Sequence, residues 1–530
     1  MKSKLYLALV AALALAVGCT TTPDNGGGVD GPTKGVLHTI KVDNSKLYTF
    51  SSDGSLRVPF VVEDADAEFL GVDGYEVLLR KEGSTSEPEE CRLDGIVNGP
   101  QQGEYVAKLK SLTSGFYTLE VTLDIKDTSS GMVYKSNTFV LSQILATGLP
   151  VMIINTADGK PITSKEEWKD ARISVIGTNN FESLEECDVE IRGRGNSTWG
   201  YDKKPYALKF PSKTSLLGMP KHKRWVLLAN TMDRTMMRNR VAYHVARQTS
   251  LAWTPRTEYI EVMLNGKHIG NYLLTEQIRI DENRINITEM ESGDNSGEAI
   301  TGGYVYEMDF HFDNVNQWWT PCGFPSSIKF PDEEDITPEQ LAWGKQYFND
   351  VEAVLFGRDF KDPQKGYAAY IDVQSFVDYW LVYEICINHE LANPGSVYLH
   401  KDRGGLLTAG PIWDFDWGTF GYNASPQAKG RLFMMEAIWY RRLFEDTAFR
   451  KVAKERWQAL YPKFVEVSNF IRSEHAYLGE SAAKNFAIWN PATTGNVNGD
   501  ENKSFDDAVL GLYNFYVDRI ETMNKIFANW

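Results

Sequence analysis

The chain has 530 residues, 42% of them hydrophobic and 24% charged, with a formal net charge of −16 at pH 7. This hydrophobic content suffices for packed cores and argues against a disordered chain. The acidic surplus disfavours a nucleic-acid-binding surface and offers no basic footprint for anionic lipid. The length suits about two to four domains.

The N-terminus has the pattern of an export signal. Lys2 and Lys4 precede an apolar run that is too short to span a bilayer comfortably, and small residues lead to Cys19. This resembles a bacterial lipoprotein signal, in which residues 1–18 are removed and Cys19 is lipidated; an ordinary secretory signal is the alternative. Residues 19–35 read as a flexible tether. We therefore expect a cell-envelope lipoprotein, periplasmic or surface-exposed, that meets the membrane through its lipid anchor only.

Residues 36–147 alternate between polar and apolar side chains, with Gly, Asp and Ser between the runs. Such alternation predicts roughly seven strands and no helix, which is typical of an all-β immunoglobulin-like sandwich. The region contains no cluster of catalytic residue types. We expect it to be a spacer or a binding module.

The pattern changes near residue 148, and we expect a second domain over residues 148–530. Its first half, to about residue 335, is rich in strand patterns, and its second half, 336–530, is rich in helix patterns. Ser164–Glu167 has the form of a capping box and predicts a short helix. Asp372 is expected to cap a long apolar helix. The fold class expected for this domain is α+β.

A glycine-rich turn and a strand lysine are candidates for binding an anion. The glycines of residues 192–198 would let backbone N–H groups approach an anion, and Arg192 and Arg194 add positive charge. Lys209 lies on the strand face opposite to the apolar side chains of its segment, so it either reaches into a cleft or is exposed to solvent. Most glycine-rich turns serve only to turn the chain.

Residues 382–420 carry the acidic candidates. An apolar helix leads into a polar loop with Glu390 and Asn393, and the segment ends in an Asp-Phe-Asp sequence. In a strand, Asp414 and Asp416 would point to the same face and repel each other unless a cation lay between them. Mg²⁺ prefers such oxygen ligands. The alternative is that the pair caps a turn or pairs with a nearby Arg.

Several sequence blocks together resemble the spore-coat CotH kinase family. In chain order they are RGRGNSTWGYDKKPYALKF, LLGMPKHKRWVLLAN, MMRN, GNYLLTEQ, GGYVYEMD, SVYLHKDRGG and AGPIWDFDWGTF. They cover about residues 150–420. One block would be a weak signal, whereas the ordered series is specific.

The resemblance implies an atypical protein-kinase-like domain with a strand-rich N-lobe and a helical C-lobe that binds ATP. By the same resemblance, Asp414 holds Mg²⁺ or Mn²⁺, Asp416 assists it, and Lys209 neutralises nucleotide phosphates. The turn would cover those phosphates with Arg192, Arg194, Gly195, Asn196, Ser197 and Thr198. Phosphoryl transfer needs mainly positioning and charge neutralisation, which these groups supply.

The sequence departs from the family pattern around the catalytic loop. Family members carry an aspartate that receives the proton of the acceptor hydroxyl, and Glu390 stands at that position. The metal-binding Asn of the family is matched by Asn393 or Ser396. No glutamate of the helix after Lys209 is placed to pair with it; Glu276 is one of three possible substitutes, with Glu258 and Glu261.

These residues leave three hypotheses open. The first is an ATP- and Mg²⁺-dependent kinase acting on Ser/Thr of an exported protein or on another hydroxyl acceptor. The second is a pseudokinase-like surface lipoprotein that binds protein or glycan. The third, glycoside hydrolysis by Glu390 and Asp414, has the required pair of carboxylates but no fixed separation between them. None of them involves nucleic acid.

Overall fold

The computed structural model describes residues 40–43, 56–62, 72–81, 89–90, 92–98, 104–110, 115–126, 133–135, 139–178, 181–312, 316–489 and 497–530. The expected signal peptide, the tether and the lipidation site Cys19 lie outside these residues. The described elements form a mixed α+β protein, which confirms the expected class.

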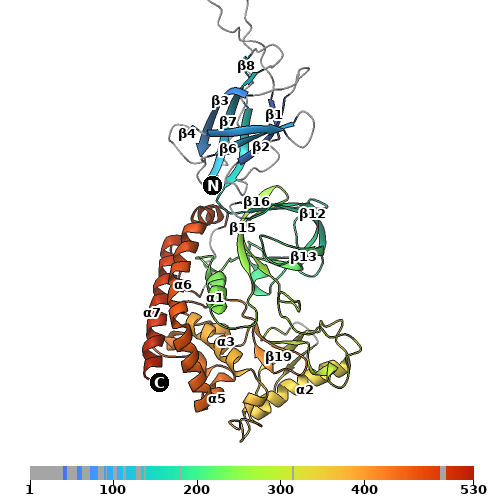
Figure 1. Cartoon of the computed structure of the whole chain (residues 1–530), viewed down its shortest axis with the longest axis vertical. Coiled ribbons are helices and arrows are strands. Elements are labelled where there is room, and N and C mark those ends of the chain that lie inside the picture. The colour runs from blue at the N-terminus through green and yellow to red at the C-terminus, as the bar shows by residue number, and fades with distance from the viewer. Residues whose placement is uncertain are drawn as a thin grey trace, which may run out of the picture.

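The first described elements are all strands. They form two antiparallel sheets, which lie together at one end of the molecule (Figure 1). One sheet has the order β1 (Ile40–Val42), β2 (Leu56–Val62), β6 (Glu104–Lys110) and β5 (Arg92–Asn98). The other has the order β4 (Glu89–Glu90), β3 (Val72–Lys81), β7 (Gly115–Lys126) and β8 (Val133–Lys135), and β9 (Phe139–Ala146) also pairs with β7. The immunoglobulin-like topology stays a prediction.

A closed seven-stranded barrel follows and occupies the middle of the molecule (Figure 1). Its strands in order are β10 (Val151–Thr156), β11 (Lys169–Ile176), β12 (Leu184–Gly193), β13 (Tyr206–Thr214), β14 (His222–Leu228), β16 (Lys267–Glu276) and β15 (Thr257–Leu264). Neighbours are antiparallel except β10 and β15, whose parallel pairing closes the barrel. Each strand points at least one fully buried apolar side chain inward: Ile154, Ile173, Ile191, Leu208, Trp225, Ile260 and Leu274.

The predicted helix at Ser164–Glu167 is wrong. The Ser164 hydroxyl accepts hydrogen bonds from the N–H groups of Glu166 (3.1 Å) and Glu167 (3.0 Å), as a capping residue would. The chain then extends towards β11 instead of continuing into a helix. A serine that satisfies these N–H groups closes an isolated turn equally well.

A second sheet joins both halves of the domain. Its order is β18 (Gln317–Trp319), β19 (Pro325–Phe330), β17 (Tyr304–Met308), β20 (Val397–Lys401) and β21 (Leu407–Ala409). β17 and β20 pair antiparallel although about ninety residues separate them. The expected division near residue 335 therefore does not separate two independent sheets.

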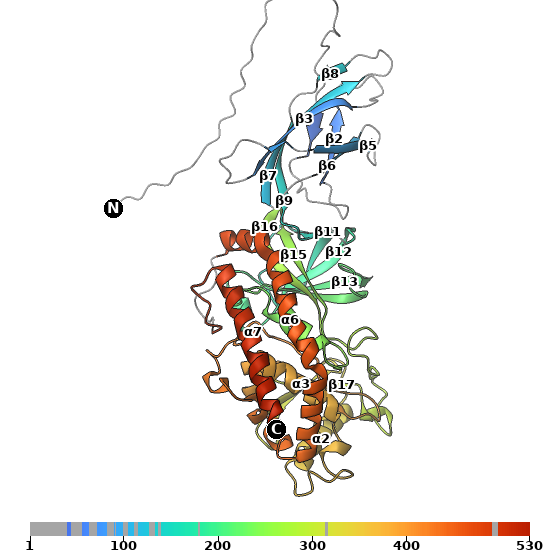
Figure 2. The ribbon, with the colours of Figure 1, turned by 60° about the vertical axis from the view of Figure 1, so that its left-hand side comes forward.

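Helices make up most of the rest. They are α1 (Arg238–Arg247), α2 (Pro338–Leu355), α3 (Val373–Cys386), α4 (His389–Ala392), α5 (Tyr440–Leu443), α6 (Thr447–Ile488) and α7 (Phe505–Ala528). Short 3₁₀ turns are η1 (Ser197–Gly200), η2 (Ala299–Thr301), η3 (Tyr367–Ala369), η4 (Pro426–Ala428) and η5 (Met434–Glu436). α6 and α7 run side by side along the barrel and the helical half (Figure 2). Among the described helices, none has the length and apolar content needed to cross a membrane.

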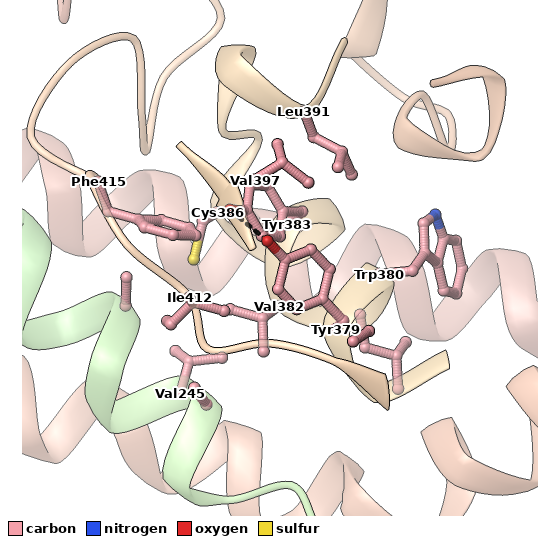
Figure 3. Close-up of a cluster of buried hydrophobic side chains, with 14 of the residues drawn as sticks. Val245, Tyr379, Trp380, Val382, Tyr383, Cys386, Leu391, Val397, Ile412 and Phe415 are labelled. Carbon is pink, nitrogen blue, oxygen red and sulfur yellow. Dashed lines mark hydrogen bonds between the residues drawn. The ribbon is translucent and has the colours of Figure 1, made fainter. Parts of the chain in front are cut away.

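The apolar helix α3 forms the centre of the helical half. Asp372 caps it by accepting a hydrogen bond from the Ser375 N–H (2.9 Å), as predicted. Tyr379 and Tyr383 are buried and share a hydrogen bond of 3.0 Å between their hydroxyls (Figure 3). The ring of Phe415 packs 4.8 Å from that of Tyr383. The middle residue of the Asp-Phe-Asp sequence is thus anchored in the core, with the two acids on either side of it.

Candidate functional site

The Asp-Phe-Asp segment lies in a loop, so the expectation that a strand aligns its two acids is wrong. β21 ends at Ala409, and Asp414 adopts a left-handed backbone conformation with φ of 65°. This conformation turns the chain between the acids in place of a strand pleat. The Asp414 and Asp416 carboxyl groups nevertheless lie close enough to share a hydrogen bond. The two carboxyl groups are therefore adjacent, as predicted, but a left-handed turn brings them together instead of a strand.

Three side-chain amides hold this loop in place. Asn239 of α1 accepts a hydrogen bond from the Phe415 N–H (2.7 Å). Asn388 donates to the Asp414 carbonyl (3.0 Å), and Asn498 donates to the Asp416 carbonyl (2.8 Å). All three asparagines are buried. Because they come from distant parts of the chain, the loop is fixed by the assembled fold rather than by local sequence.

Burial and mutual repulsion make the two acids a site for positive charge. Burial and the charge of Asp414 raise the pKa of Asp416 well above its ordinary value. Burial also raises the pKa of Asp414, while the nearby Arg194 guanidinium acts in the opposite direction. A divalent cation between the carboxylates would remove this repulsion.

Glu390 lies near the acid pair, whereas Asn393 is exposed to solvent. The Glu390 N–H donates to Asn388 Oδ1 (2.8 Å), which fixes the start of α4. Its Oε2 atom is buried and has no hydrogen-bond partner in the part of the chain that the structure describes. Burial, Asp414 and Asp416 raise the pKa of Glu390 well above its ordinary value. Asn393 is exposed at the end of α4, and no hydrogen bond of its side chain occurs within the described residues.

Asp309 is a further carboxylate at this site that sequence reasoning missed. It follows β17 and accepts a hydrogen bond from the Ser396 N–H (3.0 Å) through Oδ2. Its charge contributes to the raised pKa values of Asp414 and Glu390. The available signal was its position two residues after Glu307, which puts both acids on one face where the strand ends.

The glycine-rich turn reaches the acid pair through Arg194. Its guanidinium lies over the Trp413 ring at 5.6 Å from the ring centre. It is also close enough to Asp414 to oppose the rise in pKa that burial causes in that carboxyl. Gly195 has φ of 82°, and a Cβ there would lie 2.2 Å from Thr198 Oγ1, so only glycine fits. Asn196 and Ser197 are exposed on the outer side of the turn.

Lys209 and Arg192 lie on the outer face of the barrel beside this turn. Lys209 is half-buried and pairs with Glu190 at 2.7 Å, its neighbour in the β12–β13 register. Arg192 lies with its guanidinium 4.5 Å from the centre of the Trp168 ring. Glu190 was missed by sequence reasoning, although it stands two residues before Arg192 and shares its strand face.

Glu276, one of the three possible partners for Lys209, pairs with another residue. Its buried carboxylate accepts hydrogen bonds from the side chain (3.0 Å) and the N–H (2.9 Å) of Arg256. The two other substitutes are also occupied, Glu258 by Arg240 (3.1 Å) and Glu261 by His268 (2.7 Å). These pairings depend on strand register, which local sequence does not reveal.

The donor set fits a partly hydrated divalent cation. Within the described part of the chain, no group of three or more His, Cys, Asp or Glu side chains converges into a metal cage. Mg²⁺ does not need one, because it is usually held by one or two carboxylates together with waters and phosphate oxygens. The Asp414–Asp416 pair, with the orphaned Glu390 oxygen nearby, meets that requirement.

Buried carboxylates opposite an arginine-bearing turn are the groups that a metal-dependent phosphoryl-transfer protein uses. A family model described as CotH kinase protein matches residues 191–523, more than half of the chain. The chain therefore belongs to the CotH kinase family, as the sequence blocks predicted. The match contains every predicted site residue from Arg192 to Asp416. No curated protein matches the sequence closely enough for comparison.

Proposed function

We propose that the chain is an ATP- and Mg²⁺-dependent kinase, with Mn²⁺ as a substitute metal, that phosphorylates Ser/Thr of an exported protein or another hydroxyl acceptor. The observation that supports it most is that half-buried Asp414 and buried Asp416 lie together and face Arg194 of the glycine-rich turn. This arrangement offers one place for a cation and, beside it, one for a phosphate. Membership of the CotH kinase family supports the same reaction class.

In the proposed reaction, the chain's own residues would have the following roles. Asp414 and Asp416 would hold the metal, which would supply positive charge to neutralise the nucleotide phosphates. Arg194 would orient the phosphate nearest to Trp413, with Arg192 and Lys209 further along the barrel face. Glu390 would accept the proton of the acceptor hydroxyl at its unpaired Oε2 atom.

A second candidate is a pseudokinase-like lipoprotein that binds protein or glycan without turnover. It is favoured by the state of Glu390, because a buried carboxyl without a hydrogen-bond partner tends to hold a proton and cannot then act as a base. A metal beside it would oppose this effect by neutralising Asp414 and Asp416. The two candidates thus differ in the behaviour of one side chain.

The proposed architecture follows the family. Residues 148–530 would form a kinase-like domain whose barrel serves as the N-lobe, preceded by an immunoglobulin-like spacer or binding module over residues 36–147. Lipidation at Cys19 would anchor the protein in the cell envelope, on the periplasmic side or at the surface. The acceptor would then be an exported protein or a glycan.

The test is a labelling experiment with the purified chain. Incubated with Mg²⁺ or Mn²⁺ and ATP labelled at the γ-phosphate, it should label itself or a casein-like acceptor. Asp414→Ala should abolish the labelling, and calorimetry should measure nucleotide binding in parallel. Binding without labelling would favour the pseudokinase candidate. Absence of both would contradict the kinase proposal.

A further inference from the structure

Three cationic side chains surround one indole on the outer face of the barrel. Arg192, Arg224 and Lys209 lie with their charged groups 4.5, 5.1 and 5.6 Å from the centre of the Trp168 ring. They come from the adjacent strands β12, β13 and β14, and Lys209 and Arg224 are direct neighbours in the strand register. Cations lying over an indole are attracted by its ring electrons, so Trp168 helps to hold the cluster together.

The carboxylates around this cluster do not neutralise it. Lys209 has Glu190, and Arg279, whose charge also acts on the cluster, has Asp332 at 2.7 Å. For Arg192 and Arg224, the described residues supply no carboxylate within ion-pair distance. Arg192 donates to a backbone oxygen, that of Glu166 (3.1 Å), and the exposed Glu166 carboxylate is a more distant influence.

The surroundings of the Arg192 and Arg224 guanidinium groups disfavour their charged forms. Burial lowers the pKa of Arg224, and the charges of Arg279 and Arg192 lower it further. Burial likewise lowers the pKa of Arg192, and Arg279 adds to the effect. Excess positive charge of this kind in a chain with a net charge of −16 points to an anionic ligand.

A free hydrogen-bond donor accompanies the excess charge. The Nε atom of Arg279 is buried and has no hydrogen-bond partner among the described residues. The Arg279 guanidinium lies 4.9 Å from the centre of the Phe330 ring. Planar guanidinium groups bind phosphate oxygens with two parallel hydrogen bonds. Because aromatic rings hold these arginines in place, the arginines are preorganised to bind phosphate oxygens.

The cluster lies at the edge where the barrel meets the helical half. Arg192 is paired in the strand register with Ala207, and Ala207 with Val226, which is buried in the core shared with the helices. Two residues beyond Arg192, Arg194 reaches Trp413 beside Asp414. Positive groups therefore lead from the Trp168 cluster to the acid pair.

We propose that Arg192 and Arg224, which lie over Trp168, form a polyphosphate-binding site together with Arg279, which lies over Phe330. Arg224 is then a ligand-binding residue outside the glycine-rich turn. That the ligand of this site is the polyphosphate of a nucleotide rests on the proposed kinase function. The anion site itself rests on the uncompensated charge and on the free Arg279 donor. The chemical class of ligand is a chain of phosphate groups.

Calorimetric titration of the full chain with inorganic tripolyphosphate, and separately with ATP and Mg²⁺, tests the site. We expect Arg224→Gln to weaken tripolyphosphate binding about 10-fold and Arg224→Lys to weaken it less, because lysine keeps the charge but loses the planar donors. Arg172→Gln is the matched control. Arg172 also lies on the barrel but is exposed and paired with Glu186 (3.1 Å), so its loss should change binding less than about 2-fold.

The outcomes separate this site from the kinase proposal. Tripolyphosphate binding that Arg224→Gln weakens and Arg172→Gln leaves intact would support the site, even if ATP does not bind. ATP binding that depends on Asp414 but not on Arg224 would overturn the site and leave the kinase proposal standing. The site would also be overturned if the wild-type chain did not bind tripolyphosphate. The same holds if Arg224→Gln and Arg172→Gln weakened tripolyphosphate binding equally. Circular dichroism of each variant checks that it is folded.

Discussion

The two ends of the proposed site are built in opposite ways. The acidic end, around Asp414 and Asp416, is a loop buried between elements and held by asparagines. The basic end, around Trp168, lies on regular strands at the barrel surface and is half-buried. Like charges repel more strongly where water is excluded. The acidic end should therefore depend on its ligand far more than the basic end, and single substitutions there should have larger effects.

The largest effect is expected for Asp414→Asn. Removing the carboxylate that faces Arg194 should lower metal-dependent phosphoryl transfer by about 10²–10³-fold, a typical result of deleting one preorganised electrostatic group. The measurement is the initial rate of labelling at saturating ATP. The exposed Asp188, paired with Arg172, is the control position, and Asp188→Asn should be close to wild type. Equal rates for wild type and Asp414→Asn would rule out the proposed metal site.

Glu390→Gln should reduce the rate by about 10²-fold, because the amide cannot accept the proton of the acceptor hydroxyl. Nucleotide binding should be unchanged, since Glu390 faces the acceptor in the proposed arrangement. The check is to measure the labelling rate and the dissociation constant of ATP for the same preparation. A rate that is unaffected would show that another group, or none, serves as the base.

The free energy of unfolding is expected to depend on pH through Lys203, which joins the barrel to α6. Lys203 is buried and donates to the Asn271 carbonyl (2.5 Å) and to Asn485 Oδ1 of α6 (2.8 Å). Burial lowers the pKa of Lys203 from 10.5 to about 7. Between these values the unfolded chain holds a proton that the folded chain has released, so the free energy of unfolding rises with pH.

Urea unfolding at pH 7 and pH 9 measures this effect. Relative to Lys203→Met, which has no titrating group, the wild type should gain about 2 kcal/mol of unfolding free energy over this interval. Both proteins should change in parallel below pH 6, where Lys203 is protonated in both states. A constant difference from pH 6 to pH 9 would show that Lys203 keeps an ordinary pKa in the fold.

The smallest effect is expected for Lys209→Met, about a 10-fold weaker ATP affinity. Lys209 is half-exposed and already paired with Glu190, and the neighbouring arginines keep most of the positive charge. Glu190→Gln should act in the opposite direction, because it releases Lys209 for the phosphates. Calorimetry with ATP measures both. If Lys209→Met weakened ATP binding by as large a factor as Asp414→Asn lowers the transfer rate, the predicted difference between the two ends would be wrong.

Local sequence patterns predicted much of the fold and part of the site. The Asp372 cap and the barrel-region strands follow from short-range rules of capping and alternation. The closeness of Asp414 to Asp416 was predicted too, but a left-handed turn produces it in place of strand alternation. The partners of these residues were not predictable in the same way. Glu190 reaches Lys209 through strand register, and Asp309 joins the acids through the pairing of β17 with β20. Those contacts link segments that are distant in the sequence.

The helix α6 has a mechanical consequence for the whole domain. Its 42 residues span about 63 Å, enough to lie along both the barrel and the helical half. Near its end, Ser481 donates to Glu261 of β15 (2.6 Å), and Asn485 accepts from Lys203, while its middle packs on α3 and α7. Because α6 is hydrogen-bonded to the barrel near its C-terminal end and packed on the helical half at its middle, it leaves the two halves little freedom for a hinge motion. Entry and release of a nucleotide would then fall to the Arg194 turn and its neighbouring loops.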